Sequence, residues 1–362
     1  MSERDKKLKK KAVSIALVLA LALTLCLFSG CGSDKVTLNV YNWGINIADG
    51  TDDYIDVVAL FEEAYPDIDV NYTTYEDNES LYTRLKNGGV SYDVIIPSDY
   101  MIARMINEDM LLPLDFENIP NYELVDEQFK NQPYDPNNEY SVPYTWGTVG
   151  IIYNTTMLDY VPDSWSVLWD ENLSGQILMF NNSRDAIGIA LKYLGYSQNT
   201  TDPEQITEAV DLLIQQKPLV QAYVMDQIFD KLEGGEAAVG PYYAGDAITM
   251  IEENPDLAFV VPKEGTNLFV DAMCIPKGAQ NKENAEAFIN FMCDPENMAA
   301  NIEYIAYSSP SSAARELLSD ELKTSDICYP DEALLENTDT FINLPQDILD
   351  LYDSEWVRLM TN

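Results

Sequence analysis

Strands and helices alternate along most of this chain, and no other feature restricts its fold as strongly. Alternating apolar residues predict a strand over 36–40, and apolar residues at helical spacing predict a helix from about Asp52 to a stop at Pro66. The alternation of predicted strands and helices continues to residue 275, and the remaining sequence is largely helical. Such alternation favours α/β lobes with mostly parallel sheets.

The same criteria place further elements between residues 68 and 275. Asn78 is expected to cap a helix that ends at Gly88 and Gly89. Because no Gly/Pro-rich boundary divides the chain, we expect interleaved lobes that the chain crosses more than once. The other predicted strands are 68–72, 93–97, 149–153, 176–180, 257–261 and 268–275, and the other predicted helices are 185–194, 203–216 and 245–253.

The first thirty residues have the character of an export signal. Six basic residues precede an uncharged run of 17 residues, Ala12–Phe28, which is short for a membrane span and suits a signal peptide over 1–30. The run ends in small residues before Cys31, and this resembles the bacterial lipobox. We therefore expect acylation of Cys31, which supplies two buried chains and stable anchoring. An ordinary signal peptide and an N-terminal anchor helix are the alternatives.

Acidic residues outnumber basic ones by 61 to 21, which gives a net charge of −40. The leader carries six basic and two acidic residues, so its removal would leave 332 residues with a net charge of −44. That length suits two lobes better than one core. The charge repels nucleic acid and favours cations, so we expect no nucleic-acid partner. With 46% hydrophobic residues and 23 tyrosines, the chain should nevertheless fold.

Several kinds of chemistry find no support in the sequence. It contains no histidine, which excludes His-based catalytic triads and His metal sites. It also lacks the glycine-rich phosphate and dinucleotide loops and the nucleophile elbow, so we expect neither a cofactor nor a bound metal. Cys274, Cys293 and Cys328 are too widely spaced for a zinc site, and buried thiols are the simpler interpretation.

Aromatic and acidic residues gather near the ends of the predicted elements. Ligands bind beyond strand ends in open α/β sheets. Each residue alone is explained by a core aromatic or a helix-capping aspartate, whereas their shared position indicates a binding cleft. These residues are Trp43, Ser98, Tyr100, Tyr144, Trp146, Asp185, Tyr242, Tyr243, Phe269, Asp271 and Tyr307.

Seven runs of sequence keep the order and approximate spacing of one known family: Val40–Trp43, Thr74–Glu79, Tyr92–Tyr100, Asp135–Asn138, Ser141–Gly147, Leu194–Pro203 and Pro262–Gly265. They resemble the spermidine/putrescine-binding proteins of bacterial ABC importers over nearly the whole chain after the leader. The resemblance implies the type II periplasmic-binding-protein fold, with two interleaved lobes, a hinge and a central cleft. It divides the chain into 35–145 with 268–314 and 146–267 with 315–362.

In that family, aromatic side chains line the cleft and carboxylates hold the amines of the ligand. Tyr243 and Phe269 each replace a tryptophan, and Asp185 replaces a glutamate. The ligand-binding residues that the resemblance implies are Trp43, Ser98, Tyr100, Asp185, Tyr243, Phe269, Asp271 and Tyr307.

Four positions depart from the family pattern. Asn46 replaces a tyrosine, Met225 replaces a serine, and a late glutamine expected near Phe341 has no counterpart. Asn182 replaces an aspartate that holds one amine, which leaves Asp185 and Asp271 as the main anionic pair. Asp246, close to Tyr243 in sequence, is expected to compensate.

These features predict a non-enzymatic substrate-binding lipoprotein that captures putrescine or spermidine for an ABC importer. The expected partners are the polyamine and the permease subunits of the importer. A lipid anchor is expected to attach the protein to the membrane. We expect an exported monomer on the outer face of the cell membrane or in the periplasm. Two alternatives are ferric-iron binding through Tyr242 and Tyr243, and an exported hydrolase that uses paired carboxylates.

Overall fold

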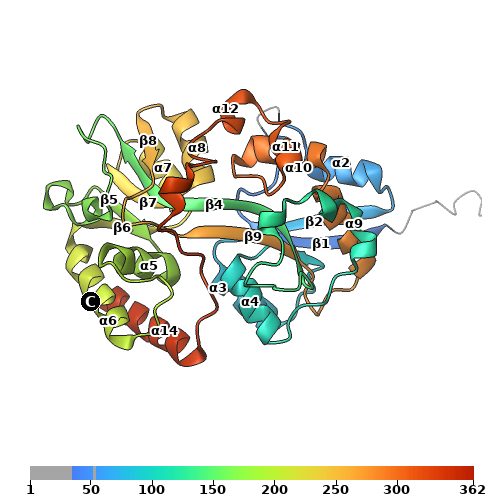
Figure 1. The fold of residues 1–362 in the computed structure, drawn as a ribbon, viewed down its shortest axis with the longest axis horizontal. Helices are drawn as coiled ribbons and strands as arrows, with labels where there is room; N and C mark the ends of the chain where they lie inside the picture. Colours follow the sequence, from blue (N-terminus) through green and yellow to red (C-terminus); the bar gives the residue numbers. More distant parts are fainter. Residues whose placement is uncertain (1–34, 52–53) are drawn as a thin grey trace, which may run out of the picture. The chain divides into compact units, whose positions relative to one another are not determined.

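Nine strands form one mixed sheet in the computed structural model, which describes residues 35–51 and 54–362 (Figure 1). The predicted signal peptide, residues 1–30, and Cys31 lie outside the described residues. The strands are β1 (Val36–Trp43), β2 (Ile68–Tyr75), β3 (Val94–Ile95), β4 (Ser141–Asn154), β5 (Ile177–Phe180), β6 (Val220–Val224), β7 (Val239–Tyr243), β8 (Leu257–Val260) and β9 (Leu268–Cys274).

The sheet contains both parallel and antiparallel pairs, so the expectation of mostly parallel sheets is wrong. The strand order is β2-β1-β3-β9-β4-β7-β5-β6, and β8 pairs with β4. The pairs β1–β3, β5–β6 and β5–β7 are parallel, as alternating strands and helices require. The difference arises at the centre, where β4 and β9 run antiparallel to each other and to the strands beside them.

Strand β4 joins the two ends of the sheet. Its first half, from Ser141 to Thr148, pairs with β9, and its second half, from Val149 to Tyr153, pairs with β7. Figure 1 shows β4 and β9 between β1 and β2 at one end and β5 to β8 at the other. All 14 residues of β4 are buried, because sheet or helix covers the strand on every side. We refer below to the β1–β3 side and the β5–β7 side of the sheet.

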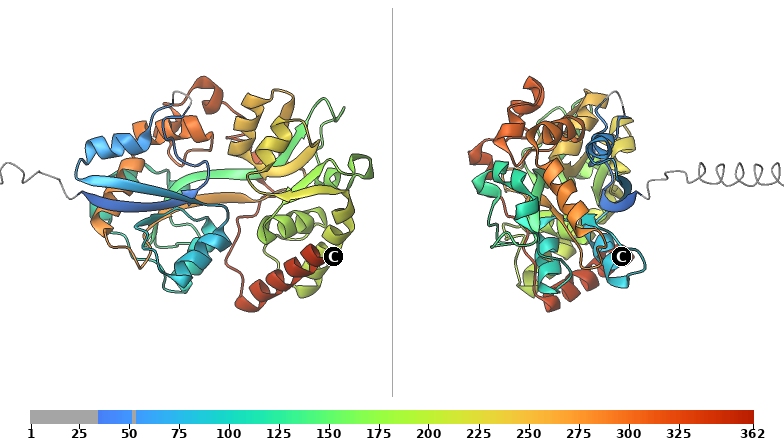
Figure 2. Two further views of the ribbon diagram at one scale, coloured as in Figure 1. Left: turned by 180° about the vertical axis from the view of Figure 1, so that it is seen from behind. Right: turned by 90° about the vertical axis from the view of Figure 1, so that its right-hand side faces the viewer.

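Helices cover both faces of the sheet. At the β1–β3 side, α2, α10 and α11 lie above the strands in Figure 1, and α3 and α4 lie below them. At the β5–β7 side, α7 and α8 lie above, and α5, α6 and α14 lie below, an arrangement that the view from behind in Figure 2 also shows. The α-helices are α2 (Val57–Ala64), α3 (Asn78–Asn87), α4 (Asp99–Asn107), α5 (Ser183–Tyr193), α6 (Pro203–Gln216), α7 (Ile228–Glu233), α8 (Ala244–Glu253), α9 (Lys282–Met292), α10 (Pro295–Ile305), α11 (Ser312–Arg315), α12 (Asp320–Lys323), α13 (Glu332–Leu335) and α14 (Gln346–Thr361).

Short 3₁₀ helices occur in the two long connections on either side of β4, and one more joins α6 to β6. Such short turns carry too few residues to show helical periodicity, so the sequence did not predict them. They are Phe116–Asn118, Pro120–Leu124, Glu127–Phe129, Trp165–Trp169, Glu171–Leu173 and Lys217–Leu219.

Helix ends follow the capping chemistry of the sequence, with two corrections. Helix α6 spans Pro203–Gln216, as predicted, and the structure shows that Asp202 caps it. Helix α3 is capped by Asp77, whose side chain accepts from Ser80 N at 2.7 Å, and not by Asn78. Helix α2 begins at Val57, later than predicted, because Asp56 caps it. The three described cysteines are free and buried, which confirms their interpretation as thiols.

Candidate functional site

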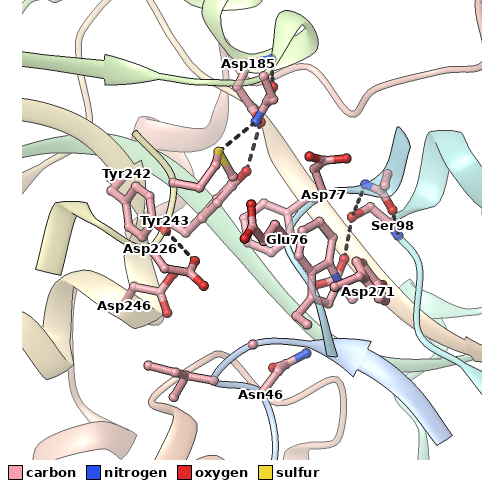
Figure 3. A pocket seen from close by; sticks show the side chains of 18 of the residues that line it. Asn46, Glu76, Asp77, Ser98, Asp185, Asp226, Tyr242, Tyr243, Asp246 and Asp271 are labelled. Atoms are coloured by element: carbon pink, nitrogen blue, oxygen red, sulfur yellow. Dashed lines mark hydrogen bonds between the residues drawn. The ribbon is translucent and has the colours of Figure 1, made fainter. Parts of the chain in front are cut away.

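The nine predicted ligand-binding residues line one cavity that opens to solvent. Figure 3 labels five of them, Ser98, Asp185, Tyr243, Asp246 and Asp271. Trp43, Ser98 and Tyr100 come from the β1–β3 side, where they follow β1 and β3. Asp185, Tyr243 and Asp246 come from the β5–β7 side, at the starts of α5 and α8. Phe269 and Asp271 lie in β9, and Tyr307 follows α10.

The cavity is strongly acidic. Its lining residues, all within the described part of the chain, include eight carboxylates and neither lysine nor arginine. Such a surface attracts a cationic ligand and repels an anionic one. The eight residues are Glu76, Asp77, Glu79, Asp99, Asp185, Asp226, Asp246 and Asp271.

Asp271 is held at the floor of the cavity by the loop before α4. Ser98 Oγ donates a hydrogen bond of 2.6 Å to Asp271 Oδ1, and Asn78 Nδ2 donates to Ser98 Oγ at 3.1 Å. Asn78 Oδ1 also accepts from Ser98 N at 3.1 Å, which fixes the loop. The Asp271 side chain is therefore oriented by neutral donors, and no ion pair neutralises it among the described residues.

Asp185 faces the cavity because another residue caps its helix. Asn182 Oδ1 accepts from Asp185 N at 2.8 Å, so the aspartate is not needed as a cap. Asn182 Nδ2 and the Tyr243 hydroxyl instead donate to Asp185 Oδ2, at 2.7 and 2.9 Å. These contacts leave Asp185 Oδ1 without a hydrogen-bond donor among the described residues. The carboxylate lies in the first turn of α5, where the positive end of the helix dipole stabilises its negative charge.

Asp246 is held by Tyr307, whose hydroxyl donates to Asp246 Oδ2 at 2.9 Å. Asp226 lies nearby on the loop after β6 and accepts from the Tyr242 hydroxyl at 3.4 Å (Figure 3). Asp246 lies in the cavity wall, and its expected part in compensating for Asn182 stays a prediction.

Burial raises the pKa of four cavity carboxyl groups into the neutral range. The pKa rises to about 7 for Asp271, for Asp246 and for Glu79, and to about 8 for Asp99. Hydrogen bonds from Ser98 to Asp271 and from Tyr307 to Asp246 oppose the rise in part. A nearby cation would favour the ionised forms, so these groups are suited to a positively charged ligand.

Aromatic rings form the apolar walls of the cavity. Tyr243 packs edge-on against Phe269 with ring centroids 5.5 Å apart, and Phe269 packs against Tyr307 at 6.1 Å. Trp43 packs against Tyr75 at 4.9 Å on the opposite side. Such faces attract ammonium groups and give apolar contact to methylene chains.

Gly245 places the Tyr307 ring against α8. A Cβ atom at Gly245 would lie 2.3 Å from Tyr307 Cδ2, much closer than real Cβ contacts. We expect Gly245→Ala to lower the free energy of unfolding, because overpacking typically costs about 1–3 kcal/mol. The gain in helix propensity is smaller, at about 0.5–1 kcal/mol. Urea unfolding measures the change, with Gly278→Ala as the control because nothing lies within 4 Å of its Cβ position. Equal or higher stability of Gly245→Ala would contradict this packing.

The four departures from the family pattern lie at or beside the cavity. Asn46 is buried, and its Nδ2 donates to Asn42 Oδ1 at 3.2 Å, so its side chain is committed to the loop after β1. Met225 Sδ lies 3.8 Å from Asn182 Nδ2. Phe341 lines the cavity and packs against Tyr100, with ring centroids 5.8 Å apart.

Some candidates from the strand ends do not line the cavity, and some lining residues were missed. Tyr144 and Trp146 are buried in the core, where Trp146 Nε1 donates to Ser309 O at 3.0 Å. The acidic residues Glu76, Asp77 and Glu79 follow the end of β2, so the strand-end argument could have found them. Asp226 is another residue that the sequence did not single out.

No cluster of three or more His, Cys, Asp or Glu side chains suited to a metal ion occurs in the described residues. Over the same part of the chain, none of the helices has the length and apolar character needed to cross a membrane.

Two family profiles and several known proteins match this chain. A family profile described as "Bacterial extracellular solute-binding protein" matches residues 91–338, and one described as "Hypothetical lipoprotein (MG045 family)" matches residues 6–139. The "Spermidine/putrescine-binding periplasmic protein" of Salmonella typhimurium is 36% identical over 303 residues, which cover 83% of this chain and 84% of that protein.

Solved structures show the same relationship. A Listeria monocytogenes structure, whose name assigns it to a spermidine/putrescine ABC transporter, has a TM-score of 0.84 and 39% identity and covers 90% of this chain and 98% of its own. The TpPotD lipoprotein of Treponema pallidum has a TM-score of 0.79 and 26% identity, with 89% of this chain and 99% of that chain covered.

Proposed function

The chain belongs to the family of bacterial extracellular solute-binding proteins, and from this premise we propose that it captures a polyamine, putrescine or spermidine, for an ABC importer. The acidic cavity is the observation that carries the proposal. Eight carboxylates line it together with aromatic rings, and no basic side chain does so among the described residues. At neutral pH a polyamine carries several positive charges separated by methylene groups, so it matches both properties.

The physical basis of binding is charge neutralisation combined with apolar burial. An ammonium group beside a carboxylate forms a charge-assisted hydrogen bond, and an aromatic face adds about 0.5–2 kcal/mol. Each buried methylene group contributes about 0.8 kcal/mol. The proposed binding residues are Trp43, Ser98, Tyr100, Asp185, Tyr243, Asp246, Phe269, Asp271 and Tyr307.

The fold is the two-lobed α/β fold of periplasmic binding proteins. The proposed lobes comprise residues 35–145 with 268–314 and residues 146–267 with 315–362. The change of partner within β4, from β9 to β7 after Thr148, supports a boundary in this strand. Binding without turnover is part of the proposal, and the relatives give no support to the iron-binding or hydrolase alternatives.

Calorimetric titration of the purified protein with putrescine, spermidine and spermine tests the function. We expect saturable binding of at least one of them, and native mass spectrometry should show an intact protein–polyamine complex. Absence of binding to all three, in protein freed of ligand by unfolding and refolding, would refute the proposal.

The proposal includes export and attachment to the membrane through Cys31, with the binding domain monomeric. The lipoprotein relative from Treponema pallidum and the lipoprotein profile over residues 6–139 support it. We expect Cys31→Ala to abolish acylation, so that the protein leaves the membrane fraction. Fractionation of cells followed by detergent phase partitioning measures this. Equal retention of the processed variant on the membrane would contradict lipidation at Cys31.

A further inference from the structure

Asn267 brings to the cavity wall a buried acceptor that no protein group satisfies. The residue lies directly before β9, is only 3% exposed and lines the cavity. Its Oδ1 atom accepts no hydrogen bond from any described residue. Trp43 Nε1 is the other buried side-chain atom without a partner among the described lining residues, but it is a donor. Because buried polar atoms are normally hydrogen-bonded, an unsatisfied acceptor in a binding cavity indicates a place for a ligand donor.

Strand geometry directs Asn267 to the same face as two residues already placed in the site. Successive side chains of a strand alternate between the two faces of a sheet, so residues 267, 269 and 271 share one face. The antiparallel ladder of β4 and β9 extends to Asn267, because Val149 N donates to Asn267 O at 3.1 Å. Phe269 and Asp271 line the cavity on this face. The strand therefore presents an amide, an aromatic ring and a carboxylate in one row.

The backbone around Asn267 is held on both sides, which fixes the position of its side chain. On the side away from β4, Leu268 N donates to Asp339 O at 3.0 Å, and Asp339 N donates to Thr266 O at 2.9 Å. Asp339 belongs to the segment between α13 and α14, and it forms a parallel bridge with Asn267. Asn267 is thus built into the sheet.

Phe269 supplies the apolar surface between the two polar residues of the row. It pairs with Gly147 of β4, and a Cβ atom at Gly147 would lie 2.9 Å from Phe269 Cζ. The ring therefore leans across the sheet onto the backbone of β4, and its other neighbour there is the Tyr243 ring. A hydrocarbon chain that connects Asp271 with Asn267 would pass along this aromatic surface.

The length of the row matches a triamine better than a diamine. Residues advance by about 3.3 Å along a strand, so the Cα atoms of Asn267 and Asp271 lie roughly 13 Å apart. With bonds of about 1.5 Å, extended spermidine spans roughly 11 Å between its terminal nitrogens, whereas putrescine spans roughly 6 Å. Hydrogen bonds of about 2.8 Å at the two ends cover the remaining distance for spermidine, but putrescine reaches only one end.

We propose that Asn267 is a ligand-binding residue, and that a triamine such as spermidine lies along β9 with one terminal ammonium group at Asp271 and the other at Asn267 Oδ1. This inference rests on the proposed function and deepens it, because it selects a triamine over a diamine. A neutral amide oxygen accepts from an ammonium group without adding another buried negative charge to the cavity. Putrescine occupies the Asp271 end of the row and leaves Asn267 without a donor.

The test compares spermidine and putrescine in calorimetric titrations of wild type, Asn267→Leu and Asn267→Asp. Leucine keeps the approximate shape of asparagine and removes the acceptor, so spermidine affinity should fall at least about tenfold, as is typical for loss of a hydrogen bond to a charged group. Putrescine affinity should change less than about threefold. Asn71→Leu is the matched control, since Asn71 is exposed on β2 outside the cavity, and it should bind both ligands like wild type.

Two further measurements keep the inference testable if Asn267→Leu fails to fold. Wild type should bind spermidine at least about tenfold more tightly than putrescine at one ionic strength. Asn267→Asp places a carboxylate at the end of the row, so it should raise the ratio of spermidine to putrescine affinity further. A smaller or unchanged ratio in this variant would contradict the inference.

The inference is overturned if wild type binds the two amines equally, or if Asn267→Leu leaves spermidine affinity unchanged. It is also overturned if Asn267→Leu weakens both ligands by the same factor, which is the result expected of a residue that only supports the sheet. Wild type that binds no polyamine would instead refute the proposed function, so the two failures are distinguishable.

Discussion

Asp271→Asn should weaken polyamine binding by at least about a hundredfold, since removing one partner of a buried ion pair typically costs about 3–5 kcal/mol. Asp271 is only 6% exposed, and the floor of the cavity offers the ammonium group little water to replace the lost charge. The asparagine keeps the shape of the side chain, and its carbonyl oxygen can still accept from Ser98 Oγ. The loss should therefore arise from charge and not from misfolding.

Titration calorimetry at one ionic strength measures this loss, because salt screens the interaction. Asp69→Asn is a suitable control, since Asp69 is exposed on β2 and outside the cavity. The control should bind like wild type. If Asp271→Asn also bound like wild type, with an unchanged circular dichroism spectrum, charge pairing at the cavity floor would be wrong.

Polyamine affinity should fall steeply as the pH drops from about 8 to about 6. Burial raises the pKa of Asp271 and of Asp246 to about 7 in the unliganded protein. A bound ammonium group favours the ionised carboxylate, so binding lowers both pKa values and releases protons. Below the unliganded pKa, each group must first lose a proton, which reduces affinity about tenfold per pH unit and per group. Glu79, with a pKa of about 7, should contribute in the same direction.

Calorimetry in buffers of different protonation enthalpy measures the protons released at each pH. Asp246→Asn should release fewer of them. The stability of the unliganded protein supplies a second readout with a defined sign. A carboxyl whose pKa is raised by folding binds more protons in the native state, so stability falls as the pH rises from about 4 to 7. The ligand should therefore raise the melting temperature more at about pH 8 than at about pH 6. Equal affinities at both pH values, without proton release, would contradict the mechanism.

The fold was largely predictable where an element shows apolar residues at regular spacing and has capping or helix-breaking residues at its ends. The bounds of α6 follow from Asp202, Pro203 and the apolar spacing within the helix. Strand β4 was only half predicted, because a strand buried over its whole length shows no alternation between apolar and polar residues. Its antiparallel pairing with β9 depends on contacts more than a hundred residues away, which local patterns do not contain.

The cavity was predictable to the extent that its residues follow strand ends. Trp43, Ser98 and Asp271 were found in this way, and the resemblance to a family also implied them. Asn78 shows why other cavity residues were not predicted. The sequence assigned it as a helix cap, whereas a tertiary contact directs its side chain to Ser98. Glu79 was overlooked although it follows the end of β2, and the structure shows that the Tyr100 hydroxyl donates to its carboxylate.

The continuity of β4 has a consequence for how the protein unfolds. The same strand pairs with β9 in its first half and with β7 in its second. Loss of the hydrogen bonds to one partner strand should therefore also destabilise the pairing with the other. The two lobes should therefore melt in one cooperative transition, with equal calorimetric and van't Hoff enthalpies. In hydrogen exchange, the amides of Ser141–Asn154 should belong to the slowest class and exchange only through global opening.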